Sequence, residues 1–399
     1  MSQEELTAGL NAQSDAAGNG GVAAAPAAGT TEDGAVPARR RLSRLPGQNG
    51  KTEDDAPTKT FEAPHRREKE TFLTHVAGVT LLSFWRTASW LLGHLPPGPS
   101  FRVGGWLAMI GYAAGPQRRR WLRANFGHVL GVPPSDKAAG RLARAAYRNY
   151  ARYVMELMRL PWLEKGEVQV LLDDADFQRF LDIYRHANGT ILVAGHIGNN
   201  EAAASGMATQ GLKINVVGDD SSFRELYELF QRMRESYGIK MISWRNLRGV
   251  YGALRRKEAL VLLVDWGYRA DGIPVKMFDC WTTLPAGPAL LAAKHGSTIL
   301  PFSICRVGDG QFRIWADQPI TVPSDSPADL ARATQEVATA LEDHIRSSPE
   351  QWYNFKPIWP ATAAEAEALE ARHAAAMAGE AGALSGKNGN GRAKSPAQS

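Results

Sequence analysis

Short apolar runs alternate with segments of helical periodicity between residues 190 and 346, and this alternation constrains the fold more than any other feature. Strands are predicted at residues 190–194, 213–217, 240–243, 259–264, 298–304 and 312–315, and helices at 223–237, 247–257, 287–295 and 329–346. The run ALVLLV at 259–264 is the clearest buried strand, because no polar residue interrupts it. Such alternation predicts an α/β fold with a mostly parallel central sheet flanked by helices.

The stretch TILVAGHIGNNEAAAS, residues 190–205, places a histidine at the end of one predicted strand. His196 follows the apolar run, and Glu201 opens an alanine-rich segment that is predicted to be helical. Open α/β sheets bind ligands at the carboxyl ends of their strands. A carboxylate folded back onto the imidazole would fix its tautomer and stabilise the imidazolium of a catalytic base. The same spacing also fits a histidine that caps a helix, with Glu201 favouring the helix N-terminus.

GHIGNNE resembles the His-x4-Asp/Glu motif of glycerolipid-type acyltransferases. It is most similar to the GHxGNWE form of bacterial lipid A late acyltransferases and phosphatidylinositol mannoside acyltransferases. Residues 272–306 resemble the family segment that follows the motif, and PEQWYNFKPIW at 349–359 resembles the closing Pro-Glu-Gln-Trp signature. With RNYARYVMELMRL upstream, the resemblance covers about residues 75–360. The chain differs at Asn200, where the family usually carries an aromatic residue, and this difference concerns the packing beside the histidine.

Four further residues are candidates for substrate contacts or for the active site. Asp265 follows the ALVLLV strand, at the same predicted sheet edge as His196. It is a candidate for a second active-site partner, and it also fits a residue that caps a turn. Arg269, in the loop that follows, is a candidate for headgroup binding. Arg234 stands where the resemblance places an arginine near the active site. This implies contact with a phosphate or a developing oxyanion, although an exposed helical arginine fits as well. Asn199, inside the motif, is also a candidate for substrate binding.

The chain is divided by composition into four parts. Residues 1–70 are rich in Ala, Gly, Pro and polar residues, so a disordered tail is predicted there. Residues 71–165 form a predicted helical part, 166–360 the α/β core, and 361–399 a C-terminal tail whose first twenty residues, roughly, are helical in composition. With 399 residues and 44% hydrophobic content, the chain can bury a large core.

Two features of the helical part predict contact with a membrane. Residues 72–95 and 101–114 are apolar and rich in tryptophan, but Arg86 interrupts the first stretch. A spanning helix needs about 20 largely uncharged residues, so helices resting in the interface without secure spanning are predicted, and the protein is expected to be peripheral or N-terminally anchored; ordinary core helices are the alternative. Arginines at 141, 144, 148, 152 and 159 share one helix face. That face is either solvated or docks on anionic headgroups or an acidic acyl carrier.

Several other classes of function lack a signal. There is no P-loop, no Gly-x-Ser-x-Gly elbow and no dinucleotide-binding glycine motif. The nine histidines show no zinc spacing, and the two cysteines, Cys280 and Cys305, fit a reducing compartment. The net charge of +5 is spread over tails and helices without a nucleic-acid motif, so no nucleic-acid partner is predicted.

The resemblance implies an O-acyltransferase at the cytoplasmic face of the bacterial inner membrane. It would move a fatty acyl chain from a thioester, acyl-CoA or acyl-carrier protein, to a hydroxyl of a membrane glycolipid or phospholipid. His196 would act as general base and Glu201 would orient it. No metal, cofactor or prosthetic group is expected, because a thioester is already activated. The alternatives are an acyl-thioester hydrolase and a non-catalytic lipid-binding relative.

Overall fold

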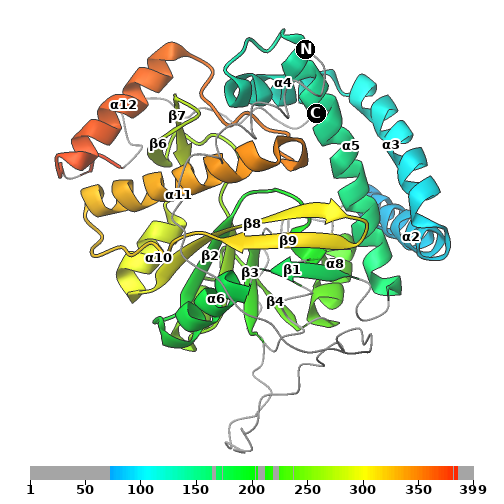
Figure 1. Ribbon diagram of the computed structural model, residues 1–399, viewed down its shortest axis with the longest axis horizontal. Helices are drawn as coiled ribbons and strands as arrows, with labels where there is room; N and C mark the ends of the chain where they lie inside the picture. Colours follow the sequence, from blue (N-terminus) through cyan, green and yellow to red (C-terminus); the bar gives the residue numbers. More distant parts are fainter. Residues whose placement is uncertain are drawn as a thin grey trace, which may run out of the picture. The chain divides into compact units, whose positions relative to one another are not determined.

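The computed structural model describes residues 72–163, 168–172, 174–202, 204, 212–218, 224–236, 238–380 and 382–384. The tail predicted for residues 1–70 and the end of the C-terminal tail lie outside the described residues. Within them, the strands form one large sheet and a separate two-stranded hairpin (Figure 1).

The large sheet has seven strands in the described part of the chain, and it is mostly parallel, as predicted. Its strands, in spatial order, are β1 (Gln169–Leu172), β9 (Gln311–Ala316), β8 (Thr298–Gly308), β2 (Thr190–Ala194), β5 (Ala259–Leu263), β3 (Ile214–Gly218) and β4 (Ile239–Ser243). The five strands from β8 to β4 run parallel, whereas β9 is antiparallel to β8 and β1 follows β9 in parallel. β2 is therefore the middle strand of the seven, between β8 and β5, and it is parallel to both neighbours.

Helices cover both faces of this sheet. Those of the α/β part are α6 (Asp174–His186), α8 (Arg224–Ser236), α9 (Leu247–Arg255), α10 (Gly287–His295) and α11 (Pro327–Ser347). Alternate residues of β2 separate the two cores: Ile191 and Val193 pack with α9, α10 and α11, and Leu192 and Ala194 pack with α6. Because side chains alternate along a strand, a strand buried on both faces reads as a continuous apolar run, which is what TILVA shows.

In the part of the chain that the structure describes, four helices precede the sheet, namely α2 (Phe72–His94), α3 (Pro97–Ala114), α4 (Pro116–Leu130) and α5 (Lys137–Arg159). The other three pack on α5, which begins where the Asp136 side chain accepts a hydrogen bond from the backbone N–H of Ala138 at 2.6 Å. Two short 3-10 turns, η2 (Leu160–Trp162) and η3 (Pro349–Gln351), also contact α5. The α5 helix thus packs both against the N-terminal helices and against the start of residues 349–359, which we call the closing segment.

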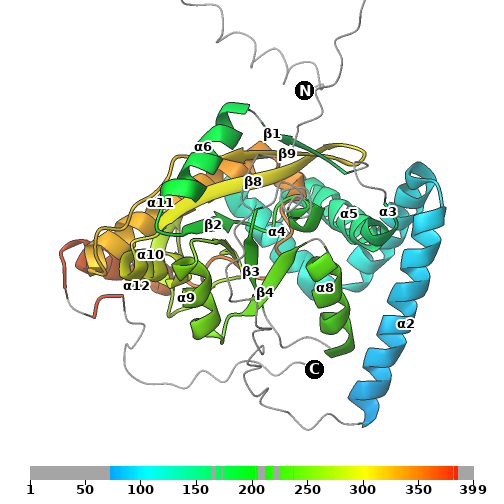
Figure 2. The ribbon, with the colours of Figure 1, turned by 90° about the horizontal axis from the view of Figure 1, so that it is seen from below.

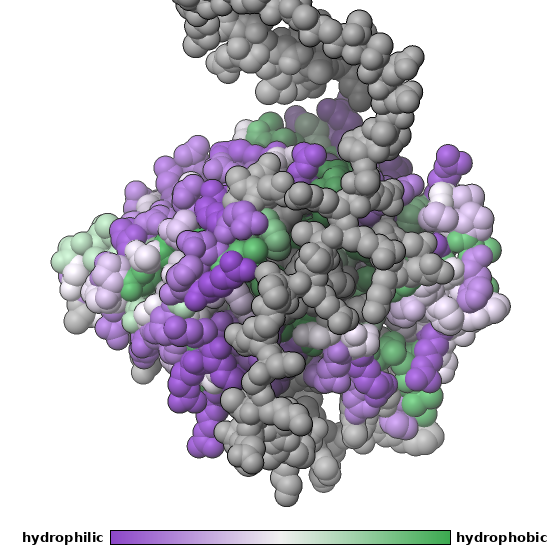
Figure 3. Space-filling view, turned by 60° about the horizontal axis from the view of Figure 1, so that its bottom comes forward, coloured by the Kyte–Doolittle hydropathy of each residue, from purple (hydrophilic) through white to green (hydrophobic). Residues whose placement is uncertain are grey.

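Large apolar side chains remain exposed along α2 and α3. They are Val76, Val79, Phe84, Trp90 and Leu91 on α2, and Val103, Trp106, Leu107 and Ile110 on α3. In the space-filling view, green apolar residues interrupt the polar surface on the right-hand side, where α2 lies (Figure 3). None of the described helices combines the length and the hydropathy needed to cross a membrane.

A hairpin and a last helix complete the described part of the chain. Strands β6 (Ile273–Met277) and β7 (Cys280–Leu284) pair around a tight turn in which Phe278 and Asp279 both have positive φ, 50° and 57°. The helix α12 (Ala363–Met377), in the segment predicted as a tail, packs against this hairpin and α11. It begins with a capping box in which the side chains of Thr362 and Glu365 bond each other's backbone N–H groups.

Candidate active site

His196 stands in a turn just past the carboxyl end of β2, and two glycines permit that turn. A Cβ atom on Gly195 would lie 2.6 Å from a methyl carbon of Leu341, and one on Gly198 would lie 2.1 Å from the carbonyl oxygen of Ile304. Gly198 also has a positive φ of 62°, which favours glycine. Larger residues at either position would push the turn away from the sheet and displace the imidazole.

The imidazole is held by Asp265, which follows the adjacent strand β5. The Nδ1 atom of His196 lies 2.6 Å from Oδ1 of Asp265, and the backbone N–H of His196 donates to Oδ2 of the same carboxylate at 2.9 Å. The Asp265 side chain is fully buried, whereas 29% of the His196 side chain is exposed. With Nδ1 bound to the carboxylate, the Nε2 atom is the nitrogen left for substrate.

The closing segment of the chain supports both residues. Nε1 of Trp352 donates to Oδ2 of Asp265 at 2.7 Å, and the amide of Asn354 donates to the carbonyl of Asp265. The backbone N–H of Tyr353 donates to the carbonyl of His196 at 2.8 Å, and that of Gly198 donates to the carbonyl of Gln351 at 3.0 Å. The Pro-Glu-Gln-Trp signature is therefore part of the site, and Trp352, which has no predicted role in the site, belongs to it.

The two groups shift each other's pKa in opposite directions. Burial lowers the pKa of His196, but the attraction and the hydrogen bond of Asp265 outweigh it and raise that pKa above its ordinary value, against a smaller lowering by Lys356. Burial raises the pKa of Asp265, but the charge and hydrogen bonds of His196 outweigh it and lower that pKa. The pair therefore favours an imidazolium beside a carboxylate, the charge state that a general base reaches when it takes a proton.

Glu201 was expected to contact His196, but in the structure it pairs with Arg234. The Glu201 carboxylate accepts two hydrogen bonds from Nε of Arg234, each 3.0 Å long, and a further one from Nη2. Both side chains are mostly buried, and the pKa of the neighbouring Tyr153 is raised by burial and by the charge of Glu201. The four intervening residues thus turn Glu201 toward α8, and the partner of His196 is Asp265, 69 residues away in the sequence.

Asn199 and Arg269 also lie differently from what was expected. Asn199 is completely buried; its Oδ1 accepts from the backbone N–H of Ala202 at 3.0 Å, and its amide donates to Glu156 at 3.1 Å. It caps the helix that begins at Asn200, so it has no exposed atom to offer a substrate. Arg269 is exposed and bonds Asp271 through both Nε (2.9 Å) and Nη2 (2.7 Å).

The arginine face of α5 divides into structural and exposed members. Arg152 bonds Glu156 at 3.1 Å, and Arg159 donates to the carbonyl of Leu95 at 2.8 Å. Glu156 in turn binds Arg306 through two hydrogen bonds of 2.6 Å and 2.8 Å, and this buried pair lies under Asn199. The arginines at 141, 144 and 148 are exposed, which leaves them available to an anionic surface.

Trp266 lies beside the imidazole, and Lys356 lies over Trp266. The ring of Trp266 is 5.9 Å from that of His196 and 54% exposed, and Nζ of Lys356 lies 3.9 Å from the Trp266 ring centroid. The Asn200 amide, at the position where an aromatic residue is usual, bonds back to the carbonyl of Gly195 at 3.4 Å. An exposed aromatic side chain is thus still present beside the histidine, but it comes from the loop after β5.

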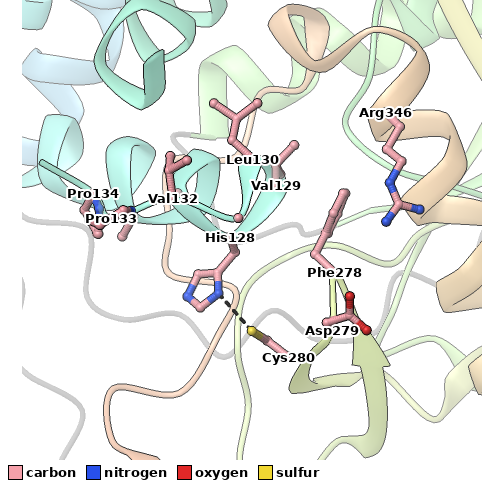
Figure 4. A pocket seen from close by; sticks show the side chains of 13 residues that line it. His128, Val129, Leu130, Val132, Pro133, Pro134, Phe278, Asp279, Cys280 and Arg346 are labelled. Atoms are coloured by element: carbon pink, nitrogen blue, oxygen red, sulfur yellow. Dashed lines mark hydrogen bonds between the residues drawn. The ribbon is translucent and has the colours of Figure 1, made fainter. Parts of the chain in front are cut away.

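A cavity of about 600 Å³ lies elsewhere, between the end of α4, the β6–β7 turn and Arg346 of α11 (Figure 4). In it, Nδ1 of His128 lies 3.3 Å from the thiol of Cys280. Burial lowers the pKa of His128, and burial together with Asp279 raises that of Cys280, so both groups are held neutral. Among the described residues no group of three metal-binding side chains occurs, here or at His196.

The fold and this site define a class: an α/β enzyme with an accessible histidine held by a buried carboxylate at the carboxyl edge of a parallel sheet. The chain belongs to the family described as bacterial lipid A biosynthesis acyltransferase, whose profile matches residues 69–360. It is therefore an acyltransferase, and membership of this family implies transfer of an acyl group to a lipid acceptor.

Relatives of known name support the same assignment. A phosphatidylinositol mannoside acyltransferase of Mycolicibacterium smegmatis is 28% identical over 256 residues, which are 62% of this chain and 82% of the relative. A protein of the same name from Mycobacterium tuberculosis, strain H37Rv, is 27% identical over 258 residues, 63% of this chain and 80% of the relative.

Proposed function

We propose that the protein transfers a fatty acyl chain from a thioester donor to a hydroxyl of a membrane glycolipid or phospholipid, with a lipid A-like or phosphatidylinositol mannoside-like acceptor. The donor would be acyl-CoA or an acyl-carrier protein. The observation that carries the proposal is the partly exposed His196 imidazole, whose Nδ1 is bound to the buried Asp265 carboxylate at 2.6 Å. This arrangement supplies a base with its tautomer and orientation fixed.

In the proposed reaction, Nε2 of His196 takes the proton of the acceptor hydroxyl while that oxygen attacks the thioester carbonyl. Asp265 stabilises the imidazolium that forms. The tetrahedral intermediate then collapses, its carbon–sulfur bond breaks, and the leaving thiolate takes the proton from Nε2. The products are an ester and a free thiol, and the histidine returns to its neutral state. The reaction proceeds by positioning and proton transfer, because a thioester is already activated for attack.

Arg234 is proposed to meet a phosphate of the acceptor or the developing oxyanion. Its guanidinium is held from one side by Glu201, which fixes its direction and leaves 17% of its side chain exposed. In this proposal Glu201 acts as a positioning residue for Arg234, whereas Asp265 serves His196. The carboxylate of the motif would then contribute to charge stabilisation rather than to proton transfer.

We further propose that the protein is peripheral on the cytoplasmic face of the bacterial plasma membrane. The exposed apolar residues of α2 and α3 would rest in the interface, and the exposed arginines of α5 would lie near anionic headgroups. The free thiols of Cys280 and Cys305 fit the reducing compartment on that side.

The acyl-transfer proposal is tested by product analysis. The purified protein is given palmitoyl-CoA in vesicles with and without phosphatidylinositol mannoside or a lipid A precursor, and the lipids are measured by mass spectrometry. We expect an acceptor lipid heavier by one acyl chain, formed only when acceptor is present. Free fatty acid released at the same rate without acceptor would identify a thioester hydrolase instead. Lipid binding without turnover on any acceptor would favour a non-catalytic relative.

Membrane attachment gives a separate expectation. The change Trp106→Ser with Leu107→Ser and Ile110→Ser removes three exposed apolar side chains of α3, and it should lower partition into anionic vesicles by about tenfold or more, at roughly 25 cal/mol per Å² of buried area. Vesicle sedimentation measures the effect. Met377→Ser on α12, also an exposed apolar residue, is the matched control and should partition like the unaltered protein. Equal partition of all three proteins would mean that α3 does not enter the interface.

A further inference from the structure

The turn after β4 and the start of α9 present two apolar side chains to solvent, interspersed with arginines. These five residues are Trp244-Arg245-Asn246, between the two elements, and Leu247-Arg248, the first two residues of α9; we call them the Trp244 loop. Trp244 is 52% exposed and Leu247 is 60% exposed. The loop is fixed at both ends, because Asn246 accepts from the backbone N–H of Gly249 at 2.9 Å and the backbone N–H of Trp244 donates to the carbonyl of Gly218 at 3.2 Å. Both side chains are therefore held outward by a defined backbone.

This loop lies on the same edge of the sheet as His196. The strand register pairs Ser243 with Gly218, Val216 with Val261, and Leu263 with Ala194, so β4, β3, β5 and β2 end at one level. His196, Trp266 and Trp244 follow those ends within three residues. Three strand spacings separate β2 from β4, which places the Trp244 loop about 14 Å from the strand that carries His196.

Helix α2 lies beside the helix that packs on β4. Helix α8 follows β3, so its first turn lies at this edge, and α8 packs between β4 and α2 (Figure 2). The ring of Trp85 on α2 meets that of Phe230 on α8 at 5.0 Å. Helix α2 is thus separated from β4, the strand that leads into the Trp244 loop, by the single helix α8.

The chemistry of the loop suits an anionic lipid surface better than a protein partner. Tryptophan favours the membrane interface, where its ring is apolar and its N–H is hydrated. The guanidinium of Arg245 lies 4.6 Å from the Trp244 ring centroid, and Lys356 lies over Trp266 in the same way, so each exposed indole carries a cation. The five residues of the loop include no acidic side chain. Basic residues near anionic lipid strengthen binding to the surface.

We propose that the Trp244 loop inserts into an anionic bilayer as a second contact beside α2 and α3, and that it turns the catalytic edge toward the lipid surface. The proposal rests on the proposed function, because it supplies the route by which a membrane-embedded acceptor hydroxyl reaches His196. The loop lies outside both the acyltransferase motif and the apolar N-terminal helices. The proposal therefore adds a membrane contact that neither of these features provides.

The test places a fluorescent label at the loop in the full-length protein. Leu247→Cys in a Cys280→Ser background is labelled with an environment-sensitive dye, and Met377→Cys in the same background is the control; Cys305 is buried. Helix α12 lies at the other end of the folded unit from α2 (Figure 1). With phosphatidylcholine vesicles containing phosphatidylglycerol, we expect a blue shift and quenching by brominated lipid at position 247 only. Vesicles of phosphatidylcholine alone should give a weaker response.

A second measurement uses the reaction itself. Trp244→Ser with Leu247→Ser should lower the ratio of acyl transfer in vesicles to acyl transfer in detergent micelles by about tenfold, through lost insertion of two apolar side chains. A protein that sediments with vesicles while the label at 247 stays in water would overturn the loop contact. An unchanged ratio would overturn it as well. If the unaltered protein transferred no acyl chain in either vesicles or micelles, the proposed function would be refuted instead.

Discussion

Replacing His196 with alanine is expected to lower the rate of acyl transfer by roughly 10²–10⁴-fold, the usual contribution of a general base. The substitution removes the nitrogen that takes the hydroxyl proton and leaves the buried Asp265 without its cationic partner. Turnover is measured with saturating palmitoyl-CoA and acceptor lipid, so that the effect appears in kcat. Because the imidazole is 29% exposed, the substitution leaves a shallow gap rather than an enclosed cavity.

The matched control is His186→Ala. His186 lies on α6 with a 75% exposed side chain and pairs with Asp182, so it is a histidine–aspartate pair without a buried carboxylate. It should retain normal turnover. If His196→Ala transfers acyl chains at nearly the normal rate while its circular dichroism and melting match the unaltered protein, then His196 caps the turn and another group is the base.

Local signals in the sequence predicted most of the sheet and its helices. Helix α10 has the predicted bounds, because Pro288 suits its first turn and Gly296 in the left-handed region ends it. The predicted strands at 190–194 and 259–264 agree with β2 and β5 to within one residue. The β6–β7 hairpin was not identified, because its turn places Phe278 and Asp279 at positive φ instead of the glycine or asparagine that usually indicates such a turn.

The site was only partly predictable, for a reason of topology. The position of His196 at a strand end follows from the sequence, but its partner depends on which strand lies beside β2. Strand β5 does, although β3 and β4 come between them in the chain. Sequence spacing favours the nearer acid, Glu201, whereas the sheet order brings Asp265 to the imidazole. Trp352 is a similar case, since the contacts that bring it to the site, its pairing with Ile197 and its hydrogen bond to Asp265, arise only when the distant segments fold together.

The most discriminating expectation compares Asp265→Asn with Glu201→Gln, because each removes one carboxylate charge and keeps the side-chain size. A base works when it is neutral, so kcat/KM of the unaltered protein should rise with pH through the raised pKa of His196 and level off above it. In Asp265→Asn the charge that raises this pKa is gone, while burial and Lys356 still lower it. The acidic limb of the profile should therefore move to lower pH.

The same substitution should also lower the plateau, by about 10²-fold or more, because the imidazolium loses its counter-charge and the ring its fixed tautomer. Glu201→Gln leaves the hydrogen bonds between His196 and Asp265 in place. Its acidic limb should stay at the pH of the unaltered protein, and its fall in kcat/KM should come from Arg234, which loses the charge of the Glu201 carboxylate. Profiles of kcat/KM across about pH 5 to 9 separate the two, since histidine titrates in that range. A limb that moves in Glu201→Gln and stays in Asp265→Asn would return the role of histidine partner to Glu201, because only a charge that acts on the imidazole can shift its titration.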